Sequence, residues 1–333
     1  MTAVIGRAHG TGGRSTHKLI EEVFHPLLKN DLLSPNDAAI APWSSPNLII
    51  TTDAHVVDPI IFPGGDIGKL AITGVINDLL TQGGRPLYIS LTFILDEGLS
   101  LALLKQVVQS IATILTENSI CLLCADTKVV PPRGQPGLMI SSTLLGEPFS
   151  KIPGFPGPKV GDKLIVTSPL GSHGLALLSA REKLPFESSI TSDCQSLLPL
   201  LTPLLTECRF LHCLRDVTRG GLAGVLHEWS RQYQVGFEID ETLLPIRAEV
   251  KAGLELLGID PLEVANEGVM LMAVAADSVE EVLSRLRVSP LGREACVIGE
   301  TTISSKTPLI MRTKLGGQRL VAWPEALNLP RIC

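Results

Sequence analysis

Phe62-Pro63-Gly64-Gly65-Asp66-Ile67-Gly68-Lys69 is a glycine-rich turn directly before a run of apolar residues with helical spacing. This spacing predicts a helix over about 68–81, which Gln82-Gly83-Gly84 ends. Apolar runs predict a strand before the turn, at 48–52, and another after the helix, at 87–95. This part of the chain is therefore predicted to alternate strands and helices.

The alternation continues to the middle of the chain. A helix is expected over about 100–118, followed by apolar strands at 120–124 and 138–145, which gives the order β-α-β-α-β-β. The stretch 146–161 contains four prolines and four glycines, and these residues disfavour regular structure. We expect the boundary between two domains in this stretch.

The second half of the chain also mixes the two kinds of element, which is typical of a layered α+β domain. Strands are predicted at 163–167, 235–239, 269–275 and 295–299. Helices are predicted at about 174–181, 196–208, 221–232, 247–257 and 279–287. The fold class is thus α+β, with domains at 1–150 and 151–322 and a mobile tail at 323–333.

Composition excludes several classes of protein. The 333 residues suffice for about two domains, and the net charge of −6 comes without a basic patch for nucleic acid. The longest apolar stretches, such as 196–205, are interrupted by prolines and are too short for a membrane span. The start, 1–13, is rich in glycine and does not read as a secretory signal. We expect a cytoplasmic protein without nucleic-acid or membrane partners.

Glycine clusters recur at three places, His9–Gly13, Pro63–Lys69 and Thr218–Gly221. Each lets the backbone approach a ligand closely, although a single cluster of this kind is more often an ordinary turn. The second precedes a helix whose free amide groups could hold a phosphate, but it matches neither the Walker nor the dinucleotide pattern.

Four aspartates stand at the ends of apolar segments or beside turns: Asp37, Asp53, Asp78 and Asp126. Carboxylates gathered from several strand ends suit Mg²⁺ bound to substrate phosphates, whereas a zinc site would show paired cysteine or histidine spacings. An isolated aspartate at such a point is usually a cap or turn residue. The four together with the glycine turns indicate a site for a metal and a nucleotide.

Seven cysteines in a chain of this length do not indicate a disulfide scaffold. Cys121 and Cys124 have the C-x-x-C spacing, but residues three apart in a strand point to opposite faces, so we expect core cysteines. Cys333 is the last residue of the sequence and follows a short segment with a proline. From the residues alone, an exposed cysteine without a role and a reactive thiol both remain open.

Two polar turns in the second half carry carboxylates ahead of regular elements. Asp216 precedes Val217-Thr218-Arg219-Gly220-Gly221, and Glu267 lies in Ala265-Asn266-Glu267-Gly268. A capping role for Asp216 and a solvent-exposed position for Glu267 are the alternatives to a role in a site.

Taken together, these segments resemble the HypE family of hydrogenase expression/formation proteins, within the superfamily named after aminoimidazole ribonucleotide synthetase. The resemblance spans nearly the whole chain. It rests on His9–Gly13, Thr52-Asp53, Phe62–Lys69, Asn77-Asp78, Asp126-Thr127-Lys128-Val129-Val130, Asp216–Gly221, Ala265–Gly268 and Pro330-Arg331-Ile332-Cys333. The last segment is the distinguishing one, because other members of the superfamily do not end in a reactive cysteine.

The resemblance implies a two-domain fold. The N-terminal sheets of two subunits would pair into a barrel across a homodimer, with ATP near that interface, and the C-terminal domain would be a mixed α/β sandwich. It also implies an activity. The carbamoyltransferase HypF would load a carbamoyl group onto Cys333, and ATP would drive its dehydration to a thiocyanate. The cyano group would pass to iron on the HypC–HypD complex and become a ligand in nickel-iron hydrogenase.

The resemblance also assigns roles to residues. The catalytic residues would be Cys333, Lys128 as a positive charge and Glu267 as the general base. Mg²⁺ would be bound by Asp37, Asp53, Asp78 and Asp126. The nucleotide would contact Gly10, Gly12, Gly13, Asp53, Gly64, Gly65, Lys69, Asn77, Asp78, Asp126, Thr127 and Asp216. One departure is Ala125, where the family commonly has glycine.

Two alternatives remain. The first is another ATP-dependent enzyme of the superfamily, such as a selenophosphate synthetase or a thiamine-phosphate kinase, neither of which needs Cys333. The N-terminal loop lacks the reactive cysteine expected of the first of these. The second is a non-catalytic partner that only carries a group on its tail.

Overall fold

The computed structural model describes residues 4–10, 14–33, 38–132, 134, 137–150, 154–184, 190–207, 209–303 and 308–324. The chain divides into two compact units. The first comprises Met1–Leu79 and Gly84–Pro148, and the second comprises Leu80–Gly83 and most of the chain from Phe149 onward. The division after Pro148 falls inside the stretch 146–161 that is rich in proline and glycine.

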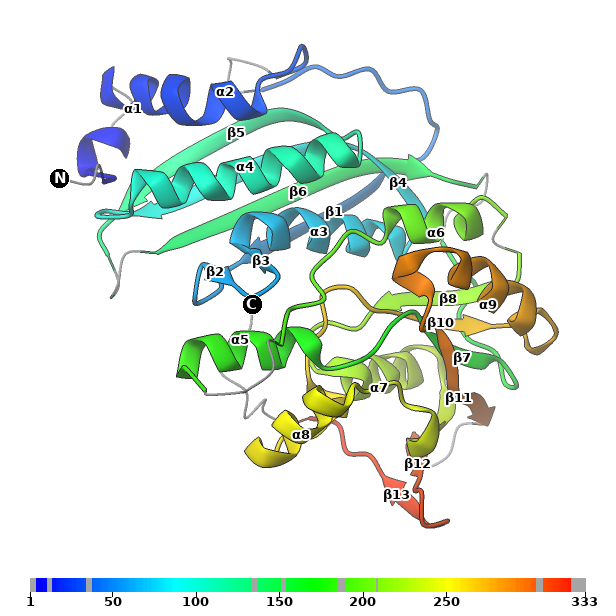
Figure 1. Cartoon of the computed structure of the whole chain (residues 1–333). Coiled ribbons are helices and arrows are strands. Elements are labelled where there is room, and N and C mark those ends of the chain that lie inside the picture. The colour runs from blue at the N-terminus through cyan, green and yellow to red at the C-terminus, as the bar shows by residue number, and fades with distance from the viewer. Residues whose placement is uncertain are drawn as a thin grey trace. The chain divides into compact units, whose positions relative to one another are not determined.

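The first unit is a four-stranded sheet with two long helices on one face (Figure 1). The strand order is β1-β6-β4-β5, and only the β4–β5 pair is parallel. The strands are β1 (Ile49–His55), β4 (Gly84–Asp96), β5 (Cys121–Val130) and β6 (Leu138–Pro148), and the helices are α3 (Ile67–Leu80) and α4 (Leu101–Glu117). Each lies where the sequence predicts an element of the same kind. The short helices α1 (Arg14–Leu19) and α2 (His25–Leu28) were not predicted.

Pairing in this sheet fixes which face each side chain occupies. Along β4, Leu91 and Phe93 are buried, while Thr92 between them is half-buried. Leu91 pairs with Ser142 of β6 and Thr92 pairs with Ser141, so the same alternation runs across both strands. The buried set faces the helices, and the half-buried set forms the opposite face.

Cys121 and Cys124 share one face, which corrects the prediction from their spacing. The register between β4 and β5 shifts after Ile89, so Cys121 pairs with Tyr88 and Cys124 pairs with Ser90. Tyr88 and Ser90 lie two residues apart and therefore point the same way. The extra residue of the bulge cancels the alternation on which the prediction rested. Both thiols are half-buried rather than core residues.

The second unit contains a seven-stranded sheet in the order β13-β12-β9-β11-β7-β10-β8. Its strands are β7 (Lys163–Val166), β8 (Leu211–Asp216), β9 (Val235–Asp240), β10 (Met270–Val274), β11 (Cys296–Ile303), β12 (Leu309–Arg312) and β13 (Gln318–Leu320). Its helices are α5 (Ser172–Glu182), α6 (Leu198–Leu205), α7 (Gly221–Tyr233), α8 (Ala248–Leu257) and α9 (Val279–Val288). The strands β8, β12 and β13 were not predicted.

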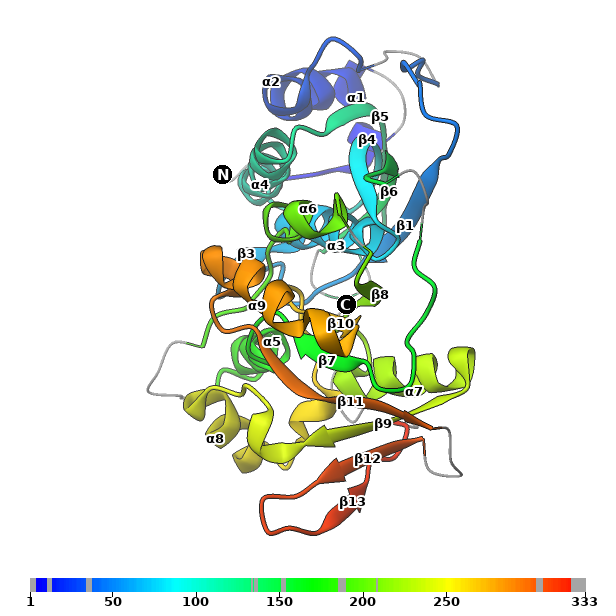
Figure 2. The same cartoon turned by 90° about the vertical axis from the view of Figure 1, so that its right-hand side faces the viewer.

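Helices cover both faces of the central strands of this sheet. Trp229 of α7 packs with Phe237 of β9 in the main core on one face. Every residue of β10 is buried, so its other face is covered as well. Figure 2 shows α6 and α9 on the side of these strands opposite α7. In the described ranges, no helix is both long and apolar enough to cross a bilayer.

Substitution of Gly68 by alanine should destabilise the first unit. A Cβ at Gly68 would lie 2.5 Å from the carbonyl oxygen of Val107 on α4, so α3 and α4 would have to separate. We expect Gly68→Ala to lower the free energy of unfolding by about 1–3 kcal/mol, measured by urea denaturation.

Gly6→Ala is the matched control, because nothing lies within 4 Å of a Cβ at Gly6. Equal unfolding midpoints for the two variants would contradict the close helix packing.

Candidate functional site

The glycine-rich turn before α3 is held by its own aspartate. It contains the short hairpin strands β2 (Ile61–Phe62) and β3 (Gly65–Asp66). Asp66 is buried, and its Oδ1 accepts hydrogen bonds from the N–H groups of Gly68 at 2.8 Å and Lys69 at 2.9 Å. The Ile67 N–H donates to the Ile60 carbonyl at 3.0 Å. The prediction of free amides for a phosphate at this helix start is therefore wrong, since these three are occupied.

The side chain of Lys69 is a group of this turn that suits a phosphate. Its Nζ donates to the carbonyl oxygen of Gly64 at 2.9 Å, which folds the side chain back over the turn. Gly64 has a φ of +98°, a conformation that favours glycine. The turn thus presents a cation beside backbone that a ligand can approach.

Asp53 and Asp78 lie on the helix-covered face of the first sheet. The hydroxyl of Thr51 on β1 donates to Oδ2 of Asp78 on α3 at 3.2 Å. Asp53 is two residues further along β1 and pairs with the buried Ser142, so it points to the same face as Thr51. Its Oδ2 lies 3.5 Å from Nε2 of the buried His55. The structure therefore places these two carboxylates on one face.

Asp126 and Lys128 lie on the opposite face of that sheet. Asp126 of β5 pairs with Thr92, whose side chain points away from the helices. Lys128 follows two residues later, and its Nζ lies 2.9 Å from Asp126 Oδ2. Both side chains are more than half exposed. The structure therefore brings the Asp126 carboxylate and the Lys128 amine together, on the face opposite the one that carries Asp53.

The four-aspartate metal site is not assembled within the described part of a single chain. Asp53 and Asp126 are on opposite faces, and among the described residues no three His, Cys, Asp or Glu side chains group as metal ligands. Asp37 lies outside the described residues, as do Gly12, Gly13 and Cys333. Gly10 ends a short 3-10 turn, Arg7–Gly10.

In the second unit the two polar turns lie against each other. Val217 follows Asp216. Its N–H donates to the carbonyl of Val269 at 3.0 Å, and its carbonyl accepts a hydrogen bond from the N–H of Asn266 at 2.9 Å. The Asn266 side chain also donates to Val217 O at 3.0 Å. Gly221 must be glycine here, because a Cβ would lie 2.4 Å from the Leu262 carbonyl. The segments that carry Asp216 and Glu267 are thus joined through their backbones.

Both carboxylates of these turns are buried, which excludes the solvent-exposed alternative for Glu267. Asp216 is 8% exposed and Glu267 is 4% exposed. Burial raises the pKa of Asp216, and bonds from Thr218 and the charge of Arg215 oppose that rise. A buried carboxyl with a raised pKa, as at Asp216, is typical of functional sites.

Asp193 is a candidate residue that the sequence did not reveal. It lies between α5 and α6 and accepts hydrogen bonds from the N–H groups of Glu267 and Gly268. Next to it, Ser192 Oγ and Nδ1 of the fully buried His173 share a hydrogen bond of 2.7 Å. No local pattern marks Asp193, because its partners Glu267 and Gly268 are more than seventy residues away.

The start of the predicted tail is packed rather than free. The ring of Trp323 stacks on His227 of α7 with centroids 5.4 Å apart, and His227 Nε2 lies 2.9 Å from the Val321 carbonyl. Residues 325–333, which include Cys333, lie outside the described residues.

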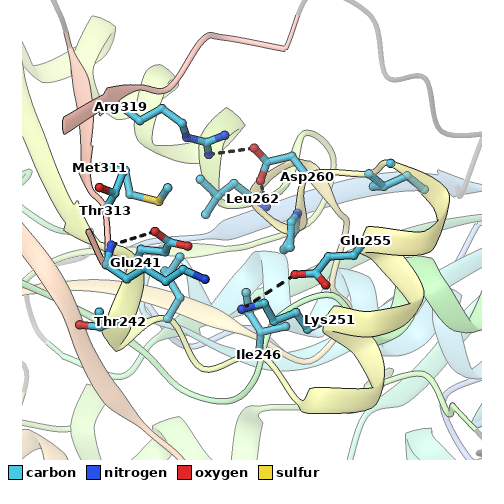
Figure 3. Close-up of a pocket in the computed structure, with 15 residues that line it drawn as sticks. Glu241, Thr242, Ile246, Lys251, Glu255, Asp260, Leu262, Met311, Thr313 and Arg319 are labelled. Atoms are coloured by element: carbon cyan, nitrogen blue, oxygen red, sulfur yellow. Dashed lines mark hydrogen bonds and ion pairs between the residues drawn. The ribbon is translucent and has the colours of Figure 1, made fainter. Parts of the chain in front are cut away.

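A pocket of about 660 Å³ in the second unit contains none of the predicted site residues (Figure 3). Its charged groups pair among themselves, as Arg319 does with Asp260 at 2.8 Å and Lys251 with Glu255 at 4.0 Å. Asp193 instead lines a smaller pocket of about 240 Å³. The candidate carboxylates of this unit therefore lie outside the larger pocket.

Comparison with known proteins identifies the family. Residues 35–147 match the N-terminal domain of the AIR synthase related proteins, and residues 159–311 match their C-terminal domain. The carbamoyl dehydratase HypE of Cupriavidus necator is 42% identical over 332 residues, which are 99% of this chain and 95% of the relative. The chain belongs to the HypE family.

Solved HypE structures share the fold over both units. A HypE crystal structure in complex with ATP is 38% identical, with a TM-score of 0.93, and the match covers 98% of this chain and 99% of that one. The HypE–HypF complex contains a chain that is 37% identical, with a TM-score of 0.80 and coverage of 92% and 99%. The predicted two-domain fold of the superfamily is thereby confirmed.

Asp66 and Asp126 should differ in their effect on stability, because the first is buried and the second is exposed. Asp66→Ala removes a buried acceptor for two amides and for the Ser110 hydroxyl. We expect it to lower the free energy of unfolding by about 1–3 kcal/mol, measured by hydrogen exchange of the α3 amides.

Asp126→Ala is the comparison, because that carboxylate is exposed and its loss should change stability by less than about 0.5 kcal/mol. A larger loss for Asp126→Ala than for Asp66→Ala would contradict this division between a buried and an exposed aspartate.

Proposed function

We propose that this chain is an ATP-dependent dehydratase that converts a carbamoyl group on its own Cys333 to a thiocyanate. The observation that carries the proposal is the match to a carbamoyl dehydratase over 99% of this chain and 95% of that relative. The product would supply the cyanide ligands of iron during maturation of nickel-iron hydrogenase. The proposed location is the cytoplasm.

The reaction needs one phosphoryl transfer and the loss of two protons. The carbamoyl oxygen attacks the γ-phosphorus of ATP, the bond to ADP breaks, and one N–H proton leaves. The phosphorylated oxygen then departs as phosphate while the second N–H proton is removed and the C≡N bond forms. The sulfur stays bonded to carbon throughout, so the products are ADP, phosphate and the thiocyanate.

Glu267 is the proposed base for the nitrogen protons. A base must lie within hydrogen-bond reach of the proton that it removes, so its backbone has to be fixed. The neighbouring Asn266 is 1% exposed and bonded on both sides, and it provides this rigidity. Lys128 is proposed to place positive charge beside the carbamoyl oxygen, with Asp126 orienting its amine.

The residues of the first unit fit Mg²⁺ as well as ATP. Mg²⁺ in such sites takes one or two carboxylates and completes its coordination with phosphate and water oxygens. Asp53 and Asp78, on one face with the Thr51 hydroxyl, provide such a pair. Bound Mg²⁺ would neutralise charge on the transferring phosphoryl group. Asp37 and Asp126 remain proposed ligands, and Lys69 is proposed to contact the phosphates.

The proposed assembly is a homodimer that pairs the first sheets into a barrel. The sheet face opposite α3 and α4 supports this proposal, because exposed Ile50 and half-buried Met139 and Leu145 lie on it. HypF is proposed to load Cys333, in line with the solved HypE–HypF complex. The HypC–HypD complex is proposed to receive the cyano group.

Intact-protein mass spectrometry tests the activity. We expect Cys333 to gain one carbamoyl group with HypF and carbamoyl phosphate, and then to lose the mass of one water only when ATP and Mg²⁺ are present. A Cys333→Ala variant should gain neither mass. Persistence of the carbamoyl mass with ATP bound would show a carrier rather than a dehydratase, and full ATP turnover by Cys333→Ala would show a small-molecule enzyme.

Glu267→Gln should stop dehydration and leave loading of Cys333 unchanged, because the amide cannot accept the nitrogen proton. Loss of a general base is expected to slow the dehydration step by about 10²- to 10⁴-fold. Glu263→Gln, in the same loop, is the control and should keep the normal rate. Normal dehydration by Glu267→Gln would remove Glu267 from the base role.

A further inference from the structure

Asp193 holds both peptide groups that flank Glu267. Its Oδ1 accepts a hydrogen bond from the Glu267 N–H at 3.3 Å, and its Oδ2 accepts one from the Gly268 N–H at 3.2 Å. Two residues later, the Gln195 N–H donates to the Glu267 carbonyl at 3.4 Å. The backbone on each side of the candidate base is thus bonded to the segment 193–195.

The approach of this segment to the turn is very close. A Cβ at Gly268 would lie 2.0 Å from the carbonyl oxygen of Asp193, so only glycine fits. From the other side, Oδ1 of Asn266 accepts the Gly171 N–H at 2.7 Å, and Nδ2 donates to the carbonyls of Val217 and Val264 at 3.0 Å each. The turn cannot slide in either direction without breaking these bonds.

We propose that Asp193 is a positioning residue that fixes Glu267 for proton abstraction. The inference rests on the proposed role of Glu267 as the base. Asp193 acts through the backbone, with one carboxylate oxygen for each amide. We call these two hydrogen bonds from the Glu267 and Gly268 N–H groups to Asp193 the clamp. A shift of about 1 Å in a reacting group can cost about 10²-fold in rate, so loss of the clamp should slow the dehydration step.

The clamp depends on the charge state of Asp193. Burial raises the pKa of Asp193 to about 6, although N–H bonds from Glu267, Gly268 and His173 lower it. Above that pH the carboxylate accepts from both turn amides, and below it the added proton turns one oxygen into a donor. Other titratable groups nearby are the His173 ring, the Glu267 carboxyl, and Arg247 and Glu294, which line the pocket and pair at 3.1 Å.

The competing explanation is a purely structural one. Asp193 also accepts the N–H of His173 in the first turn of α5, so it could serve only as a cap for that helix. A cap would affect the stability of the protein but not the pH dependence of dehydration. Rate and pH profile therefore separate the two explanations.

The test is single-turnover dehydration of the carbamoyl-loaded full chain, followed by intact mass from pH 5.5 to 8. We expect the wild-type rate constant to fall below about pH 6. For Asp193→Asn we expect a rate about 10- to 100-fold lower at pH 8, without the fall near pH 6, and an ATP affinity within about twofold of wild type. Hydrogen exchange of the Glu267 and Gly268 amides should be faster in this variant.

Asp162→Asn is the matched control, because Asp162 is also buried in the second unit and accepts a backbone N–H, from Lys159 at 2.7 Å. It should keep the normal rate and pH profile. A normal rate in Asp193→Asn despite faster exchange would overturn the proposal. A wild-type dehydration rate constant that does not change from pH 7 to 5.5 would also overturn the proposal, and this measurement needs no variant. If the wild-type protein does not dehydrate its carbamoyl group, the proposed function itself fails. Unchanged exchange of the Glu267 and Gly268 amides in Asp193→Asn would show that Asp193 does not hold these two amides.

Discussion

The candidate site of the second unit depends on the hydrogen bonds of the buried Asn266 side-chain amide. Its side chain bonds to backbone groups of Gly171, Val217 and Val264, which come from three separate segments of the chain. An unpaired amide at 1% exposure would be costly, so these bonds fix the segments together. The start of α5, the end of β8 and the turn that carries Glu267 therefore share one rigid junction.

The first unit shows the opposite use of polar groups. The buried Asp66 carboxylate accepts hydrogen bonds from helix amides, whereas Asp126 is exposed and contacts its strand neighbours Thr127 and Lys128. Exposed carboxylates keep their oxygens available for ions and phosphates, while a buried one is committed to the fold. Asp66 lies in a glycine-rich turn before a helix and Asp126 lies within a strand, and their surroundings leave the first carboxylate buried and the second exposed.

Sequence patterns located most of the elements, because α4, β4 and β6 have one buried face and regular spacing, and α3 is a long apolar run that is buried almost throughout. The strand β8 was missed, since His212 and Arg215 interrupt its apolar residues. The faces of Cys121 and Cys124 were wrong because a bulge has no signal in the residue types. The clamp at Glu267 was invisible for another reason: it joins residues 74 positions apart, and nothing local marks such a contact.

The strand order of the first sheet has a consequence for biosynthesis. β1 is an edge strand whose hydrogen-bonded neighbour is β6, and Thr52 meets its partner Thr143 across 91 residues. During translation at about 5–20 residues per second, Thr52 of β1 would emerge from the ribosome about 5–18 seconds before that partner emerges. An unpaired strand in a nascent chain is a site for misassociation, so chaperone demand should be concentrated in that interval.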